Sequence, residues 1–211
     1  MPGKDLNYRQ YWERRYRAGG TSGAGSYGDH AAYKASIVNA YLRTYDIRTV
    51  LDFGCGDGNQ LGYMDYRDYV GLDVSKAAVK ECRRKYLHDS SKRFRTYDPR
   101  KRLNEGAFDL TVSLEVLMHV VDEKDFVATL DAMFAHAAKL VIIQAPLFEL
   151  VSYQPGSTER HRRIEPYLAK YDFDIVDTII HPSVTREQRE RGEIGEMLSD
   201  FIVLTPRHPN A

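Results

Sequence analysis

Three glycines at alternate positions, together with two aspartates, form a segment suited to binding a charged ligand. Gly54, Gly56 and Gly58 follow a short apolar run in the sequence GCGDG, with Asp52 before them and Asp57 among them. Glycines in such a loop let a ligand approach the backbone closely. The two carboxylates would repel a pyrophosphate and attract a cation, so the loop favours a positively charged ligand over a dinucleotide.

Two more aspartates are predicted to end the next two strands. Asp73 ends the segment YVGLDV, and Asp98 ends KRFRTYD. In a parallel sheet these ends meet at one edge, where Asp73 can accept hydrogen bonds from both ribose hydroxyls and Asp98 lies near an adenine amino group. A ligand with a positive charge, a ribose and an adenine is S-adenosylmethionine. Each aspartate also has an alternative structural role, since Asp73 can cap a helix and Asp98, before Pro99, can belong to a turn.

Glu115 and His119 are the candidate groups for proton transfer. They lie in SLEVLMHVVDE, directly after the fourth predicted strand, and being four residues apart they share one face if the segment is helical. His119 is the predicted general base, because imidazole titrates near neutral pH. Glu115 is predicted either to assist it or to position the ligand or the loop. The structural alternative is a histidine that packs at the strand end and bonds to backbone.

The predicted acceptor site combines aromatic and basic side chains. A helix over residues 6–18 places its rings mainly on one face, and a glycine-rich loop over residues 19–30 follows it. The basic run RHRR suits an anionic or phosphorylated acceptor. Core packing is the alternative for the rings, and a solvated helix face is the alternative for the basic run. The predicted acceptor-binding residues are Tyr11, Trp12, Tyr16, Tyr27, Tyr153, His161 and Arg162.

Strands and helices alternate along the rest of the chain. Predicted strands cover residues 48–54, 69–74, 92–98, 108–116, 139–146, 173–181 and 200–206. Predicted helices cover residues 29–46, 75–87, 123–137 and 160–170, with a further helix after the glycine loop and a long hairpin connection or lid over residues 183–199. Continuous apolar runs are typical of parallel strands buried on both faces. We therefore predict an α/β fold, a doubly wound, Rossmann-like, seven-stranded and mostly parallel sheet with a C-terminal antiparallel hairpin and helices on both faces.

The motif series VLDFGCGDGNQL, GLDVS, RTYD and FDLTVSLEVLMHV resembles that of the class I S-adenosylmethionine-dependent methyltransferases. The resemblance covers residues 29–206, and the N-terminal YWERRYRAGGTSGAGSYG resembles small stand-alone bacterial members that act in sugar, surface-polymer and natural-product pathways. It implies that the glycine loop lies under the aminoacyl part of the cofactor, that Asp73 binds the ribose, that Asp98 meets the adenine, and that S-adenosylhomocysteine is the product. The cofactor-binding residues expected on this basis are Asp52, Gly54, Gly56, Asp57, Gly58, Asp73, Val74, Tyr97, Asp98 and Leu114.

The segment around Glu115 also resembles the ExxEH pattern by which ubiquinone-pathway and small-RNA O-methyltransferases hold a divalent metal. Here Met118 stands in place of the second acid, and a thioether is a poor ligand for a hard cation. The need for a divalent metal stays open, and no residue is assigned as a metal ligand.

Length and charge set limits on the class of protein. A chain of 211 residues and 24.2 kDa suits a single methyltransferase domain over residues 1–211, with the aromatic helix and glycine-rich lid in residues 1–30 and the core in residues 31–206. Thirty basic residues balance thirty acidic ones, so no net field attracts nucleic acid or an anionic membrane. Two cysteines support no disulfide framework, and neither a signal peptide nor a membrane span is evident, so we expect a cytoplasmic protein. We expect it to be a monomer or a homodimer.

The leading functional hypothesis is methyl transfer from S-adenosylmethionine to a small-molecule acceptor. We expect the methylated atom to be an oxygen, or secondly a nitrogen, of a sugar-derived, phosphorylated or natural-product metabolite. A compact chain without an added recognition module favours this hypothesis. One alternative is an RNA or protein methyltransferase, which the basic residues in 80–85 and 160–163 favour. The other is a non-catalytic protein that binds S-adenosylmethionine.

Overall fold

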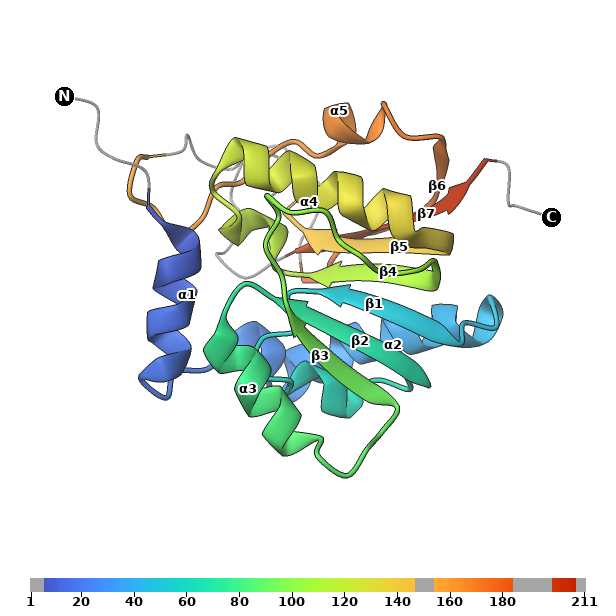
Figure 1. The fold of residues 1–211 in the computed structure, drawn as a ribbon. Coiled ribbons are helices and arrows are strands. Elements are labelled where there is room, and N and C mark those ends of the chain that lie inside the picture. Colours follow the sequence, from blue (N-terminus) through green and yellow to red (C-terminus); the bar gives the residue numbers. More distant parts are fainter. Residues whose placement is uncertain (1–5, 147–153, 184–198, 208–211) are drawn as a thin grey trace.

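In a computed structural model, seven strands form one sheet in the order β3-β2-β1-β4-β5-β7-β6 (Figure 1). The structure describes residues 6–146, 154–183 and 199–207. Strands β1 to β5 pair in parallel, and β7 lies antiparallel between β5 and β6. The predicted fold class is confirmed.

The helices are α1 (Tyr8–Arg17), α2 (Gly28–Thr44), α3 (Lys76–Lys85), α4 (Glu123–His136) and α5 (Glu165–Leu168). The strands are β1 (Thr49–Phe53), β2 (Asp68–Asp73), β3 (Lys92–Thr96), β4 (Phe108–Leu114), β5 (Ala137–Ala145), β6 (Phe173–Ile179) and β7 (Asp200–Pro206). Ser75 and Asp122 cap α3 and α4, since each side chain accepts a hydrogen bond from a backbone amide three residues later.

Helices cover both faces of the sheet. On one face Leu130 and Met133 of α4 belong to a buried cluster with Leu51 of β1. On the other face Val38 of α2 and Val79 of α3 belong to a second buried cluster that also contains sheet residues. Strands β1, β4 and β5 lie between these two layers and are largely buried, which explains their continuous apolar runs.

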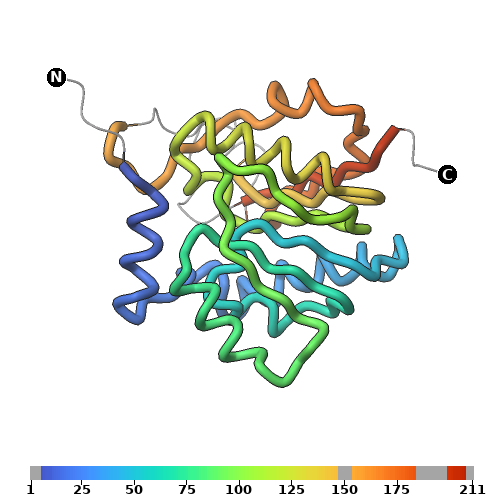
Figure 2. Tube along the Cα trace, in the orientation of Figure 1, coloured from blue at the N-terminus to red at the C-terminus, as the bar shows by residue number. Residues whose placement is uncertain are grey.

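Helix α1 stands at the carboxyl ends of the parallel strands. The arrowheads of β1, β4 and β5 point toward it (Figure 1), and the chain passes from it into α2 on the face of the sheet opposite α4 (Figure 2). Its start is fixed by Asn7, whose side chain accepts a hydrogen bond from the backbone amide of Gln10. The aromatic helix predicted from the sequence therefore covers the edge of the sheet where strand-end ligands bind.

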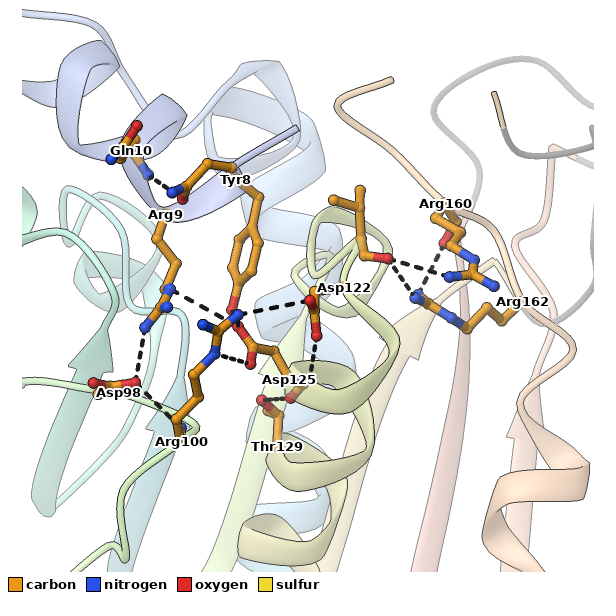
Figure 3. A network of polar contacts seen from close by, with 12 residues as sticks. Tyr8, Arg9, Gln10, Asp98, Arg100, Asp122, Asp125, Thr129, Arg160 and Arg162 are labelled. Atoms are coloured by element: carbon orange, nitrogen blue, oxygen red, sulfur yellow. Dashed lines mark hydrogen bonds and ion pairs between the residues drawn. The ribbon is translucent and has the colours of Figure 1, made fainter. Parts of the chain in front are cut away.

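A polar network attaches α1 to the rest of the fold (Figure 3). The carboxylate of Asp125 in α4 accepts hydrogen bonds from the Tyr8 hydroxyl at 3.1 Å and from Arg100 Nε at 2.8 Å. Arg9 donates to Asp98 Oδ1 at 2.8 Å. Burial, together with the nearby Asp125 carboxylate, raises the pKa of Tyr8 above its usual range, so the hydroxyl stays a donor.

We expect Asp125→Ala to lower the free energy of unfolding by about 2 kcal/mol, because it leaves the buried Tyr8 hydroxyl and a guanidinium without their acceptor. Asp131→Ala is the matched control on the same helix, since Asp131 pairs with Lys170 at an exposed site and should cost less than about 1 kcal/mol. Urea unfolding of both variants measures the difference. Equal costs would show that the buried network adds nothing to stability.

Two connections differ from the prediction. The glycine loop is followed by a 3₁₀ turn at Gln60–Tyr63 instead of an α-helix, because only residues 59–67 link the loop to β2. The predicted helix over residues 160–170 is reduced to α5, which has Pro166 in its first turn. The predicted lid over residues 183–199 lies almost entirely outside the described residues.

No helix within the described ranges is long and apolar enough to cross a bilayer.

Candidate active site

A cavity opens at the carboxyl ends of β1, β2 and β4. Gly54 and Gly56 line it after β1, Asp73 and Val74 at the end of β2, and Leu114 at the end of β4. Side chains of α1, among them Trp12 and Tyr16, line it as well. The strand-end rule for parallel sheets thus places most of the predicted cofactor-binding residues around one space.

The glycines of the loop are required by its backbone and by its neighbours. Gly54 has φ 95° and Gly56 has φ 55°, conformations that side chains with a Cβ rarely adopt. A Cβ on Gly54 would overlap the side chain of Val116, and one on Gly56 would overlap the Ser22 hydroxyl. Gly58 packs against the neighbouring helix α3 and is not among the residues that line the cavity.

The Asp73 carboxylate is hydrogen-bonded to the glycine loop. Its Oδ2 accepts a hydrogen bond from the Gly56 amide at 3.0 Å, and its Oδ1 accepts one from the Ser75 amide at 2.8 Å. The side chain is 7% exposed, and burial raises its pKa to about 6 even though these two bonds act in the opposite direction. Each oxygen keeps a second lone pair for a ligand hydroxyl.

Asp52 and Asp57 do not line this cavity. Asp52 accepts a hydrogen bond from the Tyr69 hydroxyl at 2.7 Å, and burial raises its pKa to about 7. Asp57 instead fixes the N-terminal loop, because its Oδ2 accepts hydrogen bonds from the Ser22 amide at 2.8 Å and from the Tyr27 hydroxyl at 2.7 Å. Burial acts to raise the pKa of Asp57, but these bonds and one from the Asn59 amide outweigh it and lower the pKa.

The two residues predicted near an adenine have different surroundings. Tyr97 lines the cavity and meets Phe53 edge to face, with 5.4 Å between the ring centroids. Asp98 is held in its ion pair with Arg9 and is not among the lining residues. Of this pair, the structure brings only Tyr97 to the cavity.

A second cavity adjoins the first. Tyr11, Arg15 and Glu159 line the second cavity but not the first. Five residues line both cavities, namely Trp12, Ser22, Ser26, Glu115 and His119. They mark the place where the two spaces meet.

His119 has the geometry of a proton acceptor. Its Nδ1–H donates to the Thr158 carbonyl at 3.1 Å, which leaves the lone pair on Nε2. The Trp12 ring meets the imidazole edge to face at 5.1 Å between centroids. Burial lowers the pKa of His119, so the ring is neutral at neutral pH.

Comparisons with known proteins agree with this geometry. Residues 51–142 match the family model described as "Methyltransferase domain". Residues 51–142 therefore form a methyltransferase domain, and the fold is that of the class I S-adenosylmethionine-dependent methyltransferases. The fold is similar to that of the N-methyltransferase NodS from Bradyrhizobium japonicum WM9, solved with S-adenosylhomocysteine, with a TM-score of 0.71 at 13% identity over 96% of this chain and 100% of that one.

Two further similarities involve different acceptors. Magnesium protoporphyrin IX methyltransferase from Synechocystis PCC 6803 has a TM-score of 0.61 at 19% identity, over 96% of this methyltransferase and 89% of that chain. An mRNA cap guanine-N(7) methyltransferase from Eremothecium gossypii is 33% identical over 60 residues, which are 27% of this chain and 14% of that enzyme. At these identities and lengths, neither similarity identifies the acceptor of this methyltransferase.

Three further predicted acceptor residues, Tyr27, His161 and Arg162, line neither cavity. Arg162 is 8% exposed, donates to Glu123 and to the Val121 carbonyl, and stacks on the Phe126 ring, so it is a structural residue that lines neither cavity. His161 bonds to Glu159 at 3.3 Å and also lines neither. Tyr27 is bound to Asp57, and Tyr153 lies outside the described residues.

The segment from Glu115 to His119 is not an α-helix, so the condition under which the two side chains would share one helix face is not met. Glu115 has φ 57°, which ends β4, and a 3₁₀ turn over Leu117–His119 follows. Within the described ranges, no three side chains of His, Cys, Asp or Glu come together as a possible metal-binding group.

Sequence reasoning missed Lys34. Its side chain is 2% exposed, and its Nζ donates to Glu115 Oε2 at 2.8 Å. A signal existed, because Lys34 interrupts the apolar face that Ala31, Ala35 and Val38 form on α2. A lysine on the core face of a helix requires an acidic partner.

Proposed function

We propose that the first cavity binds S-adenosylmethionine and that the second binds the acceptor. The observation that carries this proposal is the set of five residues shared by the two cavities, because a methyl group has to pass from one bound molecule to the other. Asp73 then binds the ribose, the loop around Gly54 and Gly56 supports the aminoacyl part, and Tyr97 lies beside the adenine. In this proposal residues 1–211 act as one methyltransferase domain, with residues 1–30 as its cover.

The acceptor in this proposal is a small molecule with a hydroxyl group, or secondly an amine, as its nucleophile. The second cavity has a mixed aromatic and polar lining, as small-molecule sites do. Its lining offers the rings of Tyr11 and Trp12, the carboxylate of Glu159 and the guanidinium of Arg15. Rings and hydrogen-bonding groups suit a sugar-derived or natural-product metabolite, and Arg15 is suited to a phosphorylated one.

The chemistry needs alignment more than activation, since the methyl carbon is already activated by its positive sulfur. The acceptor oxygen attacks the methyl carbon in line with the carbon–sulfur bond, and the bonding electrons return to sulfur. His119 Nε2 takes the acceptor proton. Trp12 and the loop around Ser22 and Ser26 exclude water from the junction.

Calorimetry with S-adenosylhomocysteine tests the cofactor part of the proposal. The chain has a single tryptophan, Trp12, which lines the first cavity, so its fluorescence should change with the same midpoint as the heat signal. Absence of both signals would contradict the assignment. Transfer of tritium from labelled S-adenosylmethionine into metabolite fractions then tests the acceptor part.

An RNA acceptor is the second candidate. The observations that favour it are the matched segment of the cap methyltransferase and an open groove between α1 and α3, where Arg17, Lys76 and Lys80 add positive charge. Fluorescence anisotropy with a single-stranded RNA at low salt tests it, because phosphate contacts are strongest there. An unchanged anisotropy would eliminate this candidate.

A further inference from the structure

A buried ion pair lies behind the junction of the two cavities. Lys34 of α2 is 2% exposed and its Nζ lies 2.8 Å from Glu115 Oε2, while Glu115 is 17% exposed. Glu115 lines both cavities and Lys34 lines neither. The pair is therefore oriented, with its negative end at the junction and its positive end toward the core.

The backbone around Glu115 is held in an unusual conformation. A φ of 57° is rare for a residue other than glycine, asparagine or aspartate, and such residues persist only where the surroundings fix them. Here the Glu115 amide donates to the Gln144 carbonyl at 2.8 Å. On the other side the carboxylate lies directly against Gly25, where any side chain would overlap it. Lys34 and Gly25 thus hold the carboxylate in place, and the amide hydrogen bond fixes its backbone.

We propose that Glu115, anchored by Lys34, is the carboxylate that recognises the positive charge of the methyl donor at the point of transfer. The inference rests on the proposed function, because it takes the junction as the position of the methyl group. S-adenosylmethionine is a sulfonium cation, and its product S-adenosylhomocysteine carries no charge on sulfur. A carboxylate at the junction therefore favours the donor over the product.

The proposal also fits the course of the reaction. As the acceptor lone pair bonds to the methyl carbon, the carbon–sulfur electrons return to sulfur, and the positive charge moves to the acceptor until His119 takes its proton. Both positions of the charge lie at the junction that Glu115 lines, so the carboxylate stabilises the cation throughout. After transfer the thioether sulfur is neutral and the positive charge resides on His119, so the attraction between Glu115 and the sulfur is lost.

Three ligands test the proposal without a known acceptor. Calorimetry gives the dissociation constants of S-adenosylmethionine, of S-adenosylhomocysteine, and of sinefungin, in which an amine-bearing carbon replaces the methylated sulfur. In Glu115→Gln, we expect the preference for the two cationic ligands over S-adenosylhomocysteine to fall by about fivefold, the upper range for a partly exposed charge pair. Glu159→Gln is the matched control, since Glu159 lines only the second cavity and its loss should leave this preference unchanged.

The outcomes separate this inference from the proposed function. If the wild-type protein binds none of the three ligands, the proposed function is wrong. If it binds them and Glu115→Gln keeps the wild-type preference, only the role of Glu115 is wrong. An equal loss in Glu159→Gln would also contradict the inference, because a general effect of negative charge would then explain the preference.

Variants of Lys34 separate recognition from folding. Lys34→Met leaves the Glu115 carboxylate without its partner and should destabilise the protein, whereas Lys34→Met/Glu115→Gln removes both charges and should fold. We expect the double variant to show the reduced charge preference of Glu115→Gln even where its stability is restored. A double variant with the wild-type preference would overturn the proposal.

Discussion

Asp73→Ala is expected to weaken S-adenosylhomocysteine binding by at least about 100-fold, because two hydrogen bonds to a charged acceptor are lost together. The remaining lone pairs of Asp73 are the proposed partners of the ribose hydroxyls, and the same oxygens hold the amides of Gly56 and Ser75. The substitution therefore removes a ligand contact and also releases the glycine loop. Calorimetry and Trp12 fluorescence measure the loss.

Two control variants isolate the role of Asp73. Asp98→Ala removes a carboxylate from the end of the neighbouring strand that is paired with Arg9 and does not line the cavity, so we expect a much smaller effect on affinity. Asp73→Asn keeps the shape and one acceptor oxygen, so its affinity should lie between those of the wild type and the alanine variant. If Asp98→Ala weakened binding as much as Asp73→Ala, the adenine role implied by the family resemblance would be favoured and our assignment would be wrong.

The pH dependence of binding provides an independent check on Asp73. Burial raises its pKa to about 6 in the free protein. The ribose hydroxyls of the ligand donate hydrogen bonds to the ionised carboxylate of Asp73. Where Asp73 is protonated in the free protein, binding therefore requires its carboxyl group to release a proton. Affinity should therefore rise with pH up to about 6 and level off above it. In Asp73→Asn this rise should disappear.

The sequence predicted the residues whose placement follows from strand ends. Gly54, Gly56, Asp73 and Leu114 directly follow or end parallel strands, and parallel strands bring such positions to one edge. Trp12 and Tyr16 could be predicted for a different reason. The helical spacing of the aromatic rings indicated that one face of α1 packs against another part of the protein. In both cases a local pattern and a general rule of topology were sufficient.

The sequence was a poorer guide wherever a distant partner decides the role of a charged side chain. Arg9 pairs with Asp98 across 89 positions of the chain, and Arg162 is bound to Glu123 and the Val121 carbonyl of another segment. Neither contact has a local signature, so both Asp98 and Arg162 looked available for a ligand. Lys34 shows the opposite case, because a charge on an apolar helix face does signal a buried partner, although it does not say which one.

His119→Ala is expected to reduce kcat by roughly 100- to 10,000-fold, the range for loss of a positioned general base. Its Nδ1–H is held by the Thr158 carbonyl, and its Nε2 is left to accept the proton of the acceptor. Cofactor affinity should change far less, because Asp73 and the glycine loop are untouched. Single-turnover transfer from labelled S-adenosylmethionine to the acceptor found by screening measures the rate.

The pH profile distinguishes a base from a packing residue. Burial lowers the pKa of His119, so the imidazole remains neutral at a pH where an exposed histidine would already be protonated. The rate should therefore rise with pH, with its acidic inflection below the usual histidine range, and it should level off toward neutral pH. His119→Gln keeps a polar side chain beside Trp12 but should lose both the rate and the inflection. A glutamine variant with the wild-type rate would mean that His119 only packs against Trp12 and that another group takes the proton.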